Sequence, residues 1–243
     1  TLLNNSQEGV LYINEDSDSE QAKATGIREA RGEICAMFCA DNMIMEIDLF
    51  NKVKRCLDSG HSATYPSRYF YNTKDNSLNR YFSLIGGNDP ICYYLGKNDR
   101  VPHRPDLQIN SDYQPSYGCN GFFYRSELIK FTDLDHYYPM DNAIEVGGDI
   151  IGLKSNAIWH RTSDNLISFL KKRYRYARDL YSDRNDRRWK MVDGKRDYLR
   201  LIAFIVFTLT IIQPISISTR GYSKIRDFAW FWHWPVCLGF LIT

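Results

Sequence analysis

The sequence has few of the features that mark a disulfide-rich or zinc-framework protein. Its cysteines are scattered and include no CxxC pair: Cys35, Cys39, Cys56, Cys92, Cys119 and Cys237. Structural zinc sites and secreted disulfide frameworks both use characteristic close spacings. We therefore expect reduced thiols and a cytoplasmic environment, with a disulfide between distant cysteines left open as the alternative.

The sequence also lacks an internal repeat, a low-complexity segment and the pattern of a secretory signal peptide. It starts at Thr1 without a methionine and stops at Thr243 inside an apolar run. We interpret it as a fragment of a longer protein, truncated at both ends.

Charge is distributed unevenly, although the formal net charge is only +2. Residues 1–170 carry a net charge of −7, residues 171–200 carry +7, and residues 201–243 carry +2. An acidic body followed by a basic segment and an apolar tail favours a membrane surface as partner. A nucleic-acid partner is disfavoured, because net positive charge is confined to the part of the sequence after residue 170, next to the apolar tail.

Apolar periodicity predicts a strand, a helix and a second strand near the amino terminus. Residues 9–13 read as a buried strand, residues 19–32 as a helix from Ser19 to Gly32, and residues 33–40 as a parallel strand covered on both faces. The second strand leads to Asp41, and ligands of open α/β sheets bind at the carboxyl ends of strands. Alternatively, Asp41 and Asn42 only cap the helix expected over residues 45–60.

Residues 60–115 are rich in Tyr, Asn, Gly and Pro, and we expect substrate-facing loops with short helices there rather than core. A Gly-rich turn and an apolar pair follow within residues 117–131. A strand is expected at "NAIWH", residues 156–160, and a basic amphipathic helix follows it.

The run "LIAFIVFTLTIIQPISI", residues 201–217, contains no charge and is just long enough for a short membrane span. A ten-residue basic loop, residues 218–227, separates it from the Trp-rich run 228–243. Basic residues on both sides of the first run argue against a simple crossing. We expect a re-entrant or in-plane hairpin that bends near Pro214. A buried helix of a soluble protein is the alternative for residues 201–217.

Three segments together resemble family 2 glycosyltransferases: "QAKATGIREARGEICAMFCADN", "YGCNGFFYRSELI" and "AIWHRTSDNLISFLKKRYR". The resemblance spans roughly residues 9–200 and depends on the order and spacing of these motifs. It implies an α/β GT-A-type (Rossmann-like) mixed sheet with flanking helices, with C-terminal membrane-associated helices added. It also implies that the family's first strands, which hold the donor base, precede Thr1.

In that family, the strand ends in a carboxylate pair that holds manganese or magnesium against the donor diphosphate. Here Cys39 stands at the first position and Asp41 at the second. A thiol is a soft ligand that suits these hard cations poorly, so either Asp41 alone carries the metal or metal binding is weakened. The resemblance implies that His160 completes the metal site, and a buried structural histidine is the alternative.

The resemblance also implies an inverting reaction with a carboxylate as base. Asp141 fits this role best, ahead of Glu145 and Asp149, and a helix-capping aspartate is the alternative. Four further residues are candidates for donor or acceptor binding, with a solvated lysine and plain turns as alternatives: Lys23, Asp89, Asn120 and Gly121.

These inferences combine into one expected organisation. A glycosyltransferase domain covers residues 1–168, a basic membrane-proximal helix covers 169–200, and apolar membrane segments cover 201–243. The expected activity is transfer of a sugar from a nucleotide-diphosphate sugar to a lipid-linked or saccharide acceptor, with the catalytic domain on the cytoplasmic side of the cytoplasmic membrane. The alternative is a non-catalytic, membrane-anchored scaffold or binding relative of the same fold.

Overall fold

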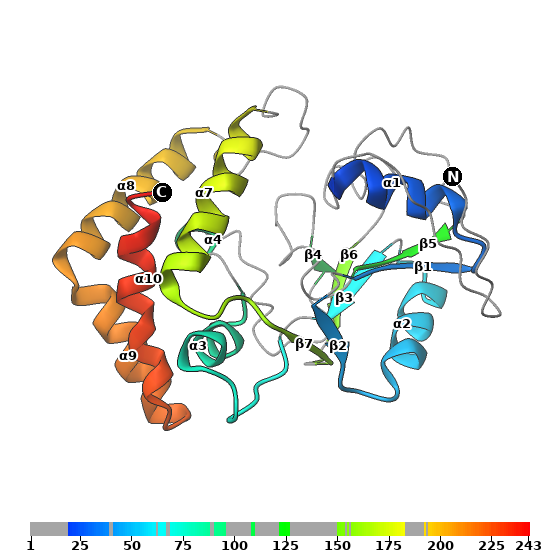
Figure 1. Ribbon diagram of the computed structural model, residues 1–243, viewed down its shortest axis with the longest axis horizontal. Coiled ribbons are helices and arrows are strands. Elements are labelled where there is room, and N and C mark those ends of the chain that lie inside the picture. Colours follow the sequence, from blue (N-terminus) through cyan, green and yellow to red (C-terminus); the bar gives the residue numbers. More distant parts are fainter. Residues whose placement is uncertain are drawn as a thin grey trace.

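The computed structural model has a mixed α/β half and a helical half (Figure 1). It describes residues 19–38, 41–61, 63–66, 69–87, 90–95, 108–109, 122–126, 150–153, 155, 157–182, 192 and 194–243. The strands are β1 (Ile34–Met37), β2 (Asn42–Ile44), β3 (Ala63–Pro66), β4 (Gln108–Ile109), β5 (Phe122–Arg125), β6 (Ile150–Leu153) and β7 (Ile158–His160). The helices are α1 (Ser19–Glu29), α2 (Leu49–Asp58), α3 (Ser77–Ile85), α4 (Pro90–Leu95), α7 (Leu166–Ser182), α8 (Gly194–Thr210), α9 (Ile212–Lys224) and α10 (His233–Phe240), with the 3-10 helix η1 (Phe228–Trp232).

The larger sheet is mixed, and its strand order is β1-β5-β3-β6-β4. Both β1 and β3 pair antiparallel with β5, so these two strands run in the same direction. The β3–β6 pair is parallel, and β4 pairs antiparallel with β6. A second, two-stranded sheet joins β2 to β7. The expected α/β class with a mixed sheet and flanking helices is therefore confirmed.

Strand β1 confirms the apolar strand expected before Asp41, but its surroundings differ from the expectation. Among the described residues it pairs only with the antiparallel β5, and its side chains alternate between buried Cys35 and exposed Ala36. The exposed Ala36 contradicts the expected cover on both faces, whereas parallel pairing on the other edge of β1 is not tested by the described residues. The strand expected over residues 9–13 lies outside the described residues. Helix α1 confirms the preceding helix, although it ends at Glu29, before Gly32.

Helix α2 packs one apolar stripe onto the sheet. Leu49, Val53 and Leu57 follow one another at intervals of four residues and are all buried. They form a core with Phe123 of β5 and Ile158 of β7. The helix begins at Leu49 after Asp48, so the alternative in which Asp41 and Asn42 cap this helix is wrong. Strand β2 lies between Asp41 and the helix instead.

Helix α3 is the centre of the helical half. Helices α3 and α4 confirm the short helices expected within residues 60–115, whereas the expectation that this segment contributes no core is wrong. The Asn76 side chain caps its first turn by accepting from the backbone N–H of Asn79 at 2.8 Å. Gly86 ends it in the left-handed region at φ 83°, which glycine adopts without strain. Tyr81 and Phe82 are fully buried. The same helix also contributes Leu78, Leu84 and Ile85 to this core.

The C-terminal segments fold against α3 and α4. Helix α7 confirms the basic amphipathic helix. Helix α9 occupies most of residues 218–227, so the loop predicted there is wrong. Within the described part of the chain no single helix is long and apolar enough to cross a bilayer, whereas α8 and α9 together could and are bent by 79°. The bend lies close to Pro214, which is in the first turn of α9, and the predicted re-entrant or in-plane membrane hairpin stays a prediction.

The second apolar run, residues 228–243, is largely buried inside the protein. Ala229, Val236 and Cys237 pack with Phe82 of α3 and Phe204 of α8 in one apolar core. Two of the three indole nitrogens of this run also bond to protein groups, because Trp232 donates to Ser77 Oγ and Trp234 donates to the Thr208 carbonyl oxygen. This run is therefore a packing element of the helical half.

A buried ion pair fastens the turn between α9 and η1 to α3. Asp227 accepts from Arg80 Nε at 2.7 Å and Nη2 at 3.2 Å, and from Tyr71 Oη at 2.6 Å. Its other role is to cap η1 through the backbone N–H of Ala229 at 2.8 Å. Burial alone would raise the pKa of Asp227, but these bonds outweigh it and lower the pKa to about 2.

We predict that Asp227→Asn destabilises the protein and flattens its acid unfolding. Because the pKa of Asp227 is depressed, its contribution is complete above the ordinary value of 3.8 and is lost as the pH falls toward about 2. At neutral pH we expect a loss of about 2–4 kcal/mol in the free energy of unfolding, since the substitution leaves Arg80 without its anionic partner. Urea denaturation at several pH values measures both effects. An unchanged slope between pH 4 and 2 would contradict the assignment.

We also predict opposite effects for two Gly→Ala substitutions in helices. A Cβ at Gly221 would lie 2.2 Å from the Trp230 ring, whereas a Cβ at Gly26 would meet nothing within 4 Å. We expect Gly221→Ala to cost about 1–3 kcal/mol through overpacking. The matched control Gly26→Ala should stabilise the exposed α1 by about 0.5–1 kcal/mol. Equal thermal stabilities for both variants would show that α9 and η1 pack less closely than described.

Candidate functional site

Two residues predicted as metal ligands meet at the carboxyl end of β1. Asp41 lies between β1 and β2, and His160 is the last residue of β7. Asp41 Oδ1 lies 3.2 Å from His160 Nδ1. The two residues are far apart in the sequence, so the tertiary fold alone brings them together. Their pairing is the strongest structural indication of a site in the described residues.

The register of the small sheet positions the histidine. Asn42 is directly opposite His160 in the antiparallel β2–β7 pair. The Asn42 Nδ2 atom lies 3.5 Å from His160 Nδ1, so this nitrogen faces an amide as well as a carboxylate. The backbone of β2 continues into a hydrogen bond from Met45 N–H to the Ala157 carbonyl oxygen at 2.6 Å. Asp41, one residue before this pairing begins, is therefore held beside the imidazole.

His160 is buried while Asp41 remains accessible. The imidazole side chain is 2% exposed and the Asp41 carboxylate is 39% exposed. The Tyr69 ring packs on the imidazole at a centroid distance of 5.3 Å. Tyr69 also belongs to the core of the helical half. The site thus has one side formed by the packed rings of His160 and Tyr69, and an accessible carboxylate, Asp41, that a ligand can reach.

The electrostatic surroundings keep Asp41 ionised. The hydrogen bond from His160 lowers the pKa of Asp41, and it outweighs burial, which acts in the opposite direction. Electrostatic interactions with His160 and Lys172 lower the pKa of Asp41 further. Lys172 belongs to α7, which begins a few residues after β7, and it is partly buried. The Asp41 carboxylate therefore contacts an imidazole and lies within electrostatic range of an ammonium group.

Lys172 is the site residue that sequence reasoning missed. The basic residues of α7 were interpreted as membrane contacts, because they form a cluster next to an apolar run. The available signal was position, since Lys172 lies in the second turn of the helix that directly follows His160. A lysine there can face the carboxyl end of β1 rather than solvent.

The other predicted site residues are not placed by the structure. Cys39, Asp89, Asn120, Gly121 and Asp141 lie outside the described residues, as do the alternative bases Glu145 and Asp149. Lys23 belongs to α1, but its side chain is not described. Their roles stay predictions.

The described residues offer a metal two protein ligands. They contain no group of three or more His, Cys, Asp or Glu side chains that could hold a metal ion. Two ligands each about 2.1 Å from an octahedral ion lie roughly 3 Å apart, close to the observed 3.2 Å between Asp41 Oδ1 and His160 Nδ1. The pair therefore fits one edge of a coordination sphere, and a ligand such as a diphosphate would supply further oxygens.

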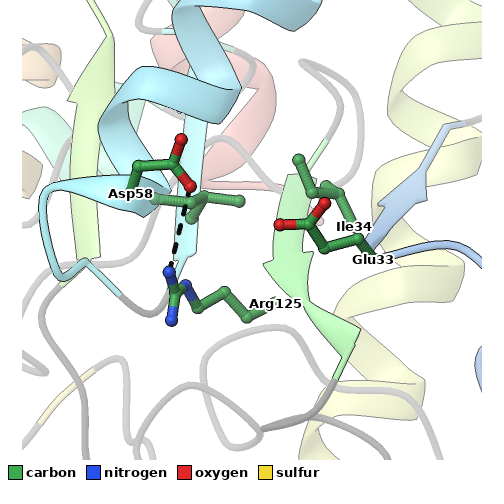
Figure 2. A pocket seen from close by; sticks show the side chains of 5 residues that line it. Glu33, Ile34, Asp58 and Arg125 are labelled. Atoms are coloured by element: carbon green, nitrogen blue, oxygen red, sulfur yellow. Dashed lines mark ion pairs between the residues drawn. The ribbon is translucent and has the colours of Figure 1, made fainter.

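A small cavity lies at the other end of β1 and is separate from this pair. It is lined by Glu33, Ile34, Leu57, Asp58 and Arg125. Figure 2 shows Arg125 turned toward Asp58, an ion pair of 4.0 Å. Glu33 and Asp58 both also pair with Lys54. Its charged groups are therefore engaged with one another at the protein surface.

We predict that His160→Ala raises the pKa of Asp41 toward its ordinary value of 3.8, because the hydrogen bond from His160 is the largest influence on it. A carboxyl-carbon NMR titration of Asp41 measures this shift. The control is Arg161→Ala, which removes an exposed arginine paired with Asp164 and should leave Asp41 unchanged. An Asp41 titration that is identical in wild type and His160→Ala would show that the two side chains do not interact in solution.

Comparison with known proteins adds nothing to the geometry of the site. No family model, no curated protein and no solved structure matches this chain.

Proposed function

We propose that the protein is a family 2-type glycosyltransferase of GT-A-like fold that uses a nucleotide-diphosphate sugar as donor. The single observation that carries the proposal is the Asp41–His160 pair at the carboxyl end of β1. The resemblance in sequence selects these two residues as ligands before their positions are known, and in the fold they are adjacent. Helix-capping by Asp41 would not require His160 nearby.

The architecture around the pair supports the same proposal. Strands β1 and β3 run in one direction with the antiparallel β5 between them, and Asp41 follows the end of β1. Ligands of α/β sheets bind beyond the carboxyl ends of such strands. The small β2–β7 sheet then adds a side wall to this end of the sheet. A donor diphosphate placed there would contact Asp41, which is the accessible member of the pair.

The charges around Asp41 suit a diphosphate bridged by a divalent cation. Asp41 and His160 would hold manganese or magnesium as an oxygen and a nitrogen ligand. When bound, the metal would neutralise the charge that develops on the nucleoside diphosphate leaving group. Lys172 adds a second positive charge on the same side, because its ammonium group already influences Asp41. Tyr69 and Asn42 lie against the His160 imidazole and fix its position. Metal binding would replace the hydrogen bond between His160 Nδ1 and Asp41, because a ligating nitrogen carries no proton.

Inverting transfer also requires a base that takes the proton of the acceptor hydroxyl as that oxygen bonds to the anomeric carbon. We assign this role to Asp141, with Lys23, Asp89, Asn120 and Gly121 as donor- or acceptor-binding residues. These five assignments rest on the resemblance in sequence alone. The acceptor is proposed to be a lipid-linked or other saccharide at the cytoplasmic face of the membrane.

The second candidate function is a non-catalytic scaffold or binding protein of the same fold. The observation that favours it is the small donor set, since the described residues supply two ligands rather than three or more. The sequence adds Cys39 at the position where the related family has a carboxylate. In this alternative the Asp41–His160 pair is a structural hydrogen bond that fixes β2 against β7.

We predict that the full-length protein binds a UDP- or GDP-sugar in the presence of Mn²⁺, and that Asp41→Ala and His160→Ala weaken this binding at least about tenfold. Loss of a metal ligand should cost no less than loss of a supporting residue, which is typically 10–100-fold. Isothermal titration with a panel of sugars, with and without Mn²⁺, gives the affinities.

The matched control is Asp58→Ala, which removes an exposed carboxylate at the opposite end of β1 and should bind as wild type does. Binding that is unchanged by Asp41→Ala would overturn the proposed site. Absence of binding for every donor would favour the scaffold instead.

A further inference from the structure

Helices α8 and α9 and the 3-10 helix η1 carry exposed apolar side chains, which we call the apolar face: Leu199, Ile202, Val206, Leu209, Ile212 and Phe228. In Figure 1, α8 and α9 form the outer edge of the helical half, on the side away from the sheet. Ile202, Leu209 and Ile212 are 57%, 64% and 75% exposed. The described residues provide no cover for this face.

The apolar face follows a regular spacing of apolar residues along α8 and does not consist of isolated apolar residues. On α8 its members recur at intervals of three, four and three residues, which places them on one side of the helix. The opposite side of the helix contains Phe204 and Thr208, which are fully buried. A helix between a protein core and water normally has a polar outer side. Helix α8 is instead apolar on both sides, so its outer side fits a second apolar medium.

Charge around the face is of one sign. The only acidic residues of 194–243 are Asp197 and Asp227, and both are buried. The exposed charges are all basic and lie at both ends of the α8–α9 pair: Lys195 and Arg196 at the start of α8, and Arg220, Lys224 and Arg226 at and beyond the end of α9. Such a rim complements an anionic surface. A second copy of this chain would bring the same positive charges together.

We propose that the apolar face inserts into one leaflet of an anionic phospholipid bilayer, with α8 and α9 lying in the plane of the membrane. The 79° bend between the two helices and the basic residues at both ends of the pair favour this placement, because it leaves all of these charges at the same headgroup layer. The placement rests on exposure, charge and helix direction. It does not depend on the transfer of a sugar.

The first test measures binding of the full-length protein to extruded vesicles by co-sedimentation. We expect binding to vesicles of phosphatidylcholine with phosphatidylglycerol, and at least tenfold weaker binding to phosphatidylcholine alone. The double variant Ile202→Asn/Leu209→Asn should bind the anionic vesicles at least tenfold more weakly than wild type. The matched control is Ile47→Asn, a fully exposed isoleucine of the α/β half, which should bind as wild type does.

Circular dichroism and thermal melting serve as the control that the variants are folded, which we expect because the substituted positions are exposed. Equal vesicle binding by wild type and the double variant would overturn the proposal, as would absence of binding by wild type. A dimer in analytical ultracentrifugation that the double variant abolishes, without any effect on vesicles, would assign the face to a second copy and also overturn it.

The second test decides between an in-plane and a crossing arrangement. The variants Arg196→Cys and Arg226→Cys each introduce a cysteine at one of the two basic ends. Each variant is bound to the outer surface of vesicles, and a membrane-impermeant maleimide is then added to the outside. Mass spectrometry then reads labelling at the engineered position. Labelling of both sites supports the in-plane arrangement, and protection of one site alone overturns it. Neither test uses a nucleotide sugar, so failure of the transferase proposal would leave these results unaffected.

Discussion

The antiparallel pairing of β2 with β7 is the contact on which the proposed site depends. It places Asn42 opposite His160, and Asp41 is then one residue from the pairing. A shift of one residue in this register would turn the His160 side chain to the other face of the sheet. The core beneath the strands opposes such a shift, because Ile158 is fully buried against Leu49 and Val53 of α2. Packing in the α/β half therefore fixes the geometry of a polar pair.

Strand β7 also connects the two halves of the protein. Ile158 accepts a backbone hydrogen bond from Phe70 at 2.7 Å, and Trp159 Nε1 donates to Asp75 Oδ2 at 2.8 Å. A few residues later, the backbone N–H of Ser163 donates to the Asn79 side chain at 3.1 Å. These bonds join the strand that carries His160 to the start of α3. Because Arg80 of α3 holds Asp227, the same helix anchors the apolar C-terminal helices. The site and the apolar face are thus attached to one rigid element.

Local patterns in the sequence were sufficient for the elements that lead into the site. The apolar run before Asp41 and the basic helix after His160 were both predicted, because a buried strand and an amphipathic helix have recognisable periods. The core role of α3 was missed, since its core residues include Tyr81 and Phe82 within a segment rich in Asn and Gly. Composition alone suggested loops there. The helix at 212–224 was missed for a related reason, because Ser, Thr and Gly at 218–223 resemble a loop although they allow close packing on Trp230.

The Asp41–His160 contact shows which parts of a site the sequence alone can and cannot predict. The resemblance in sequence selected both residues as ligands, and a carboxylate and an imidazole are both groups that can bind a cation. No local feature of the sequence predicts the distance between them. That distance depends on the pairing of β2 with β7, a strand more than a hundred residues later in the chain. Lys172 shows the converse. The charge of Lys172 is visible in the sequence, but its proximity to Asp41 is not. Lys172 was therefore grouped with the basic residues expected to contact lipid. The basic segment therefore has two different electrostatic roles: one lysine acts on Asp41, and the basic residues around the apolar face complement an anionic membrane.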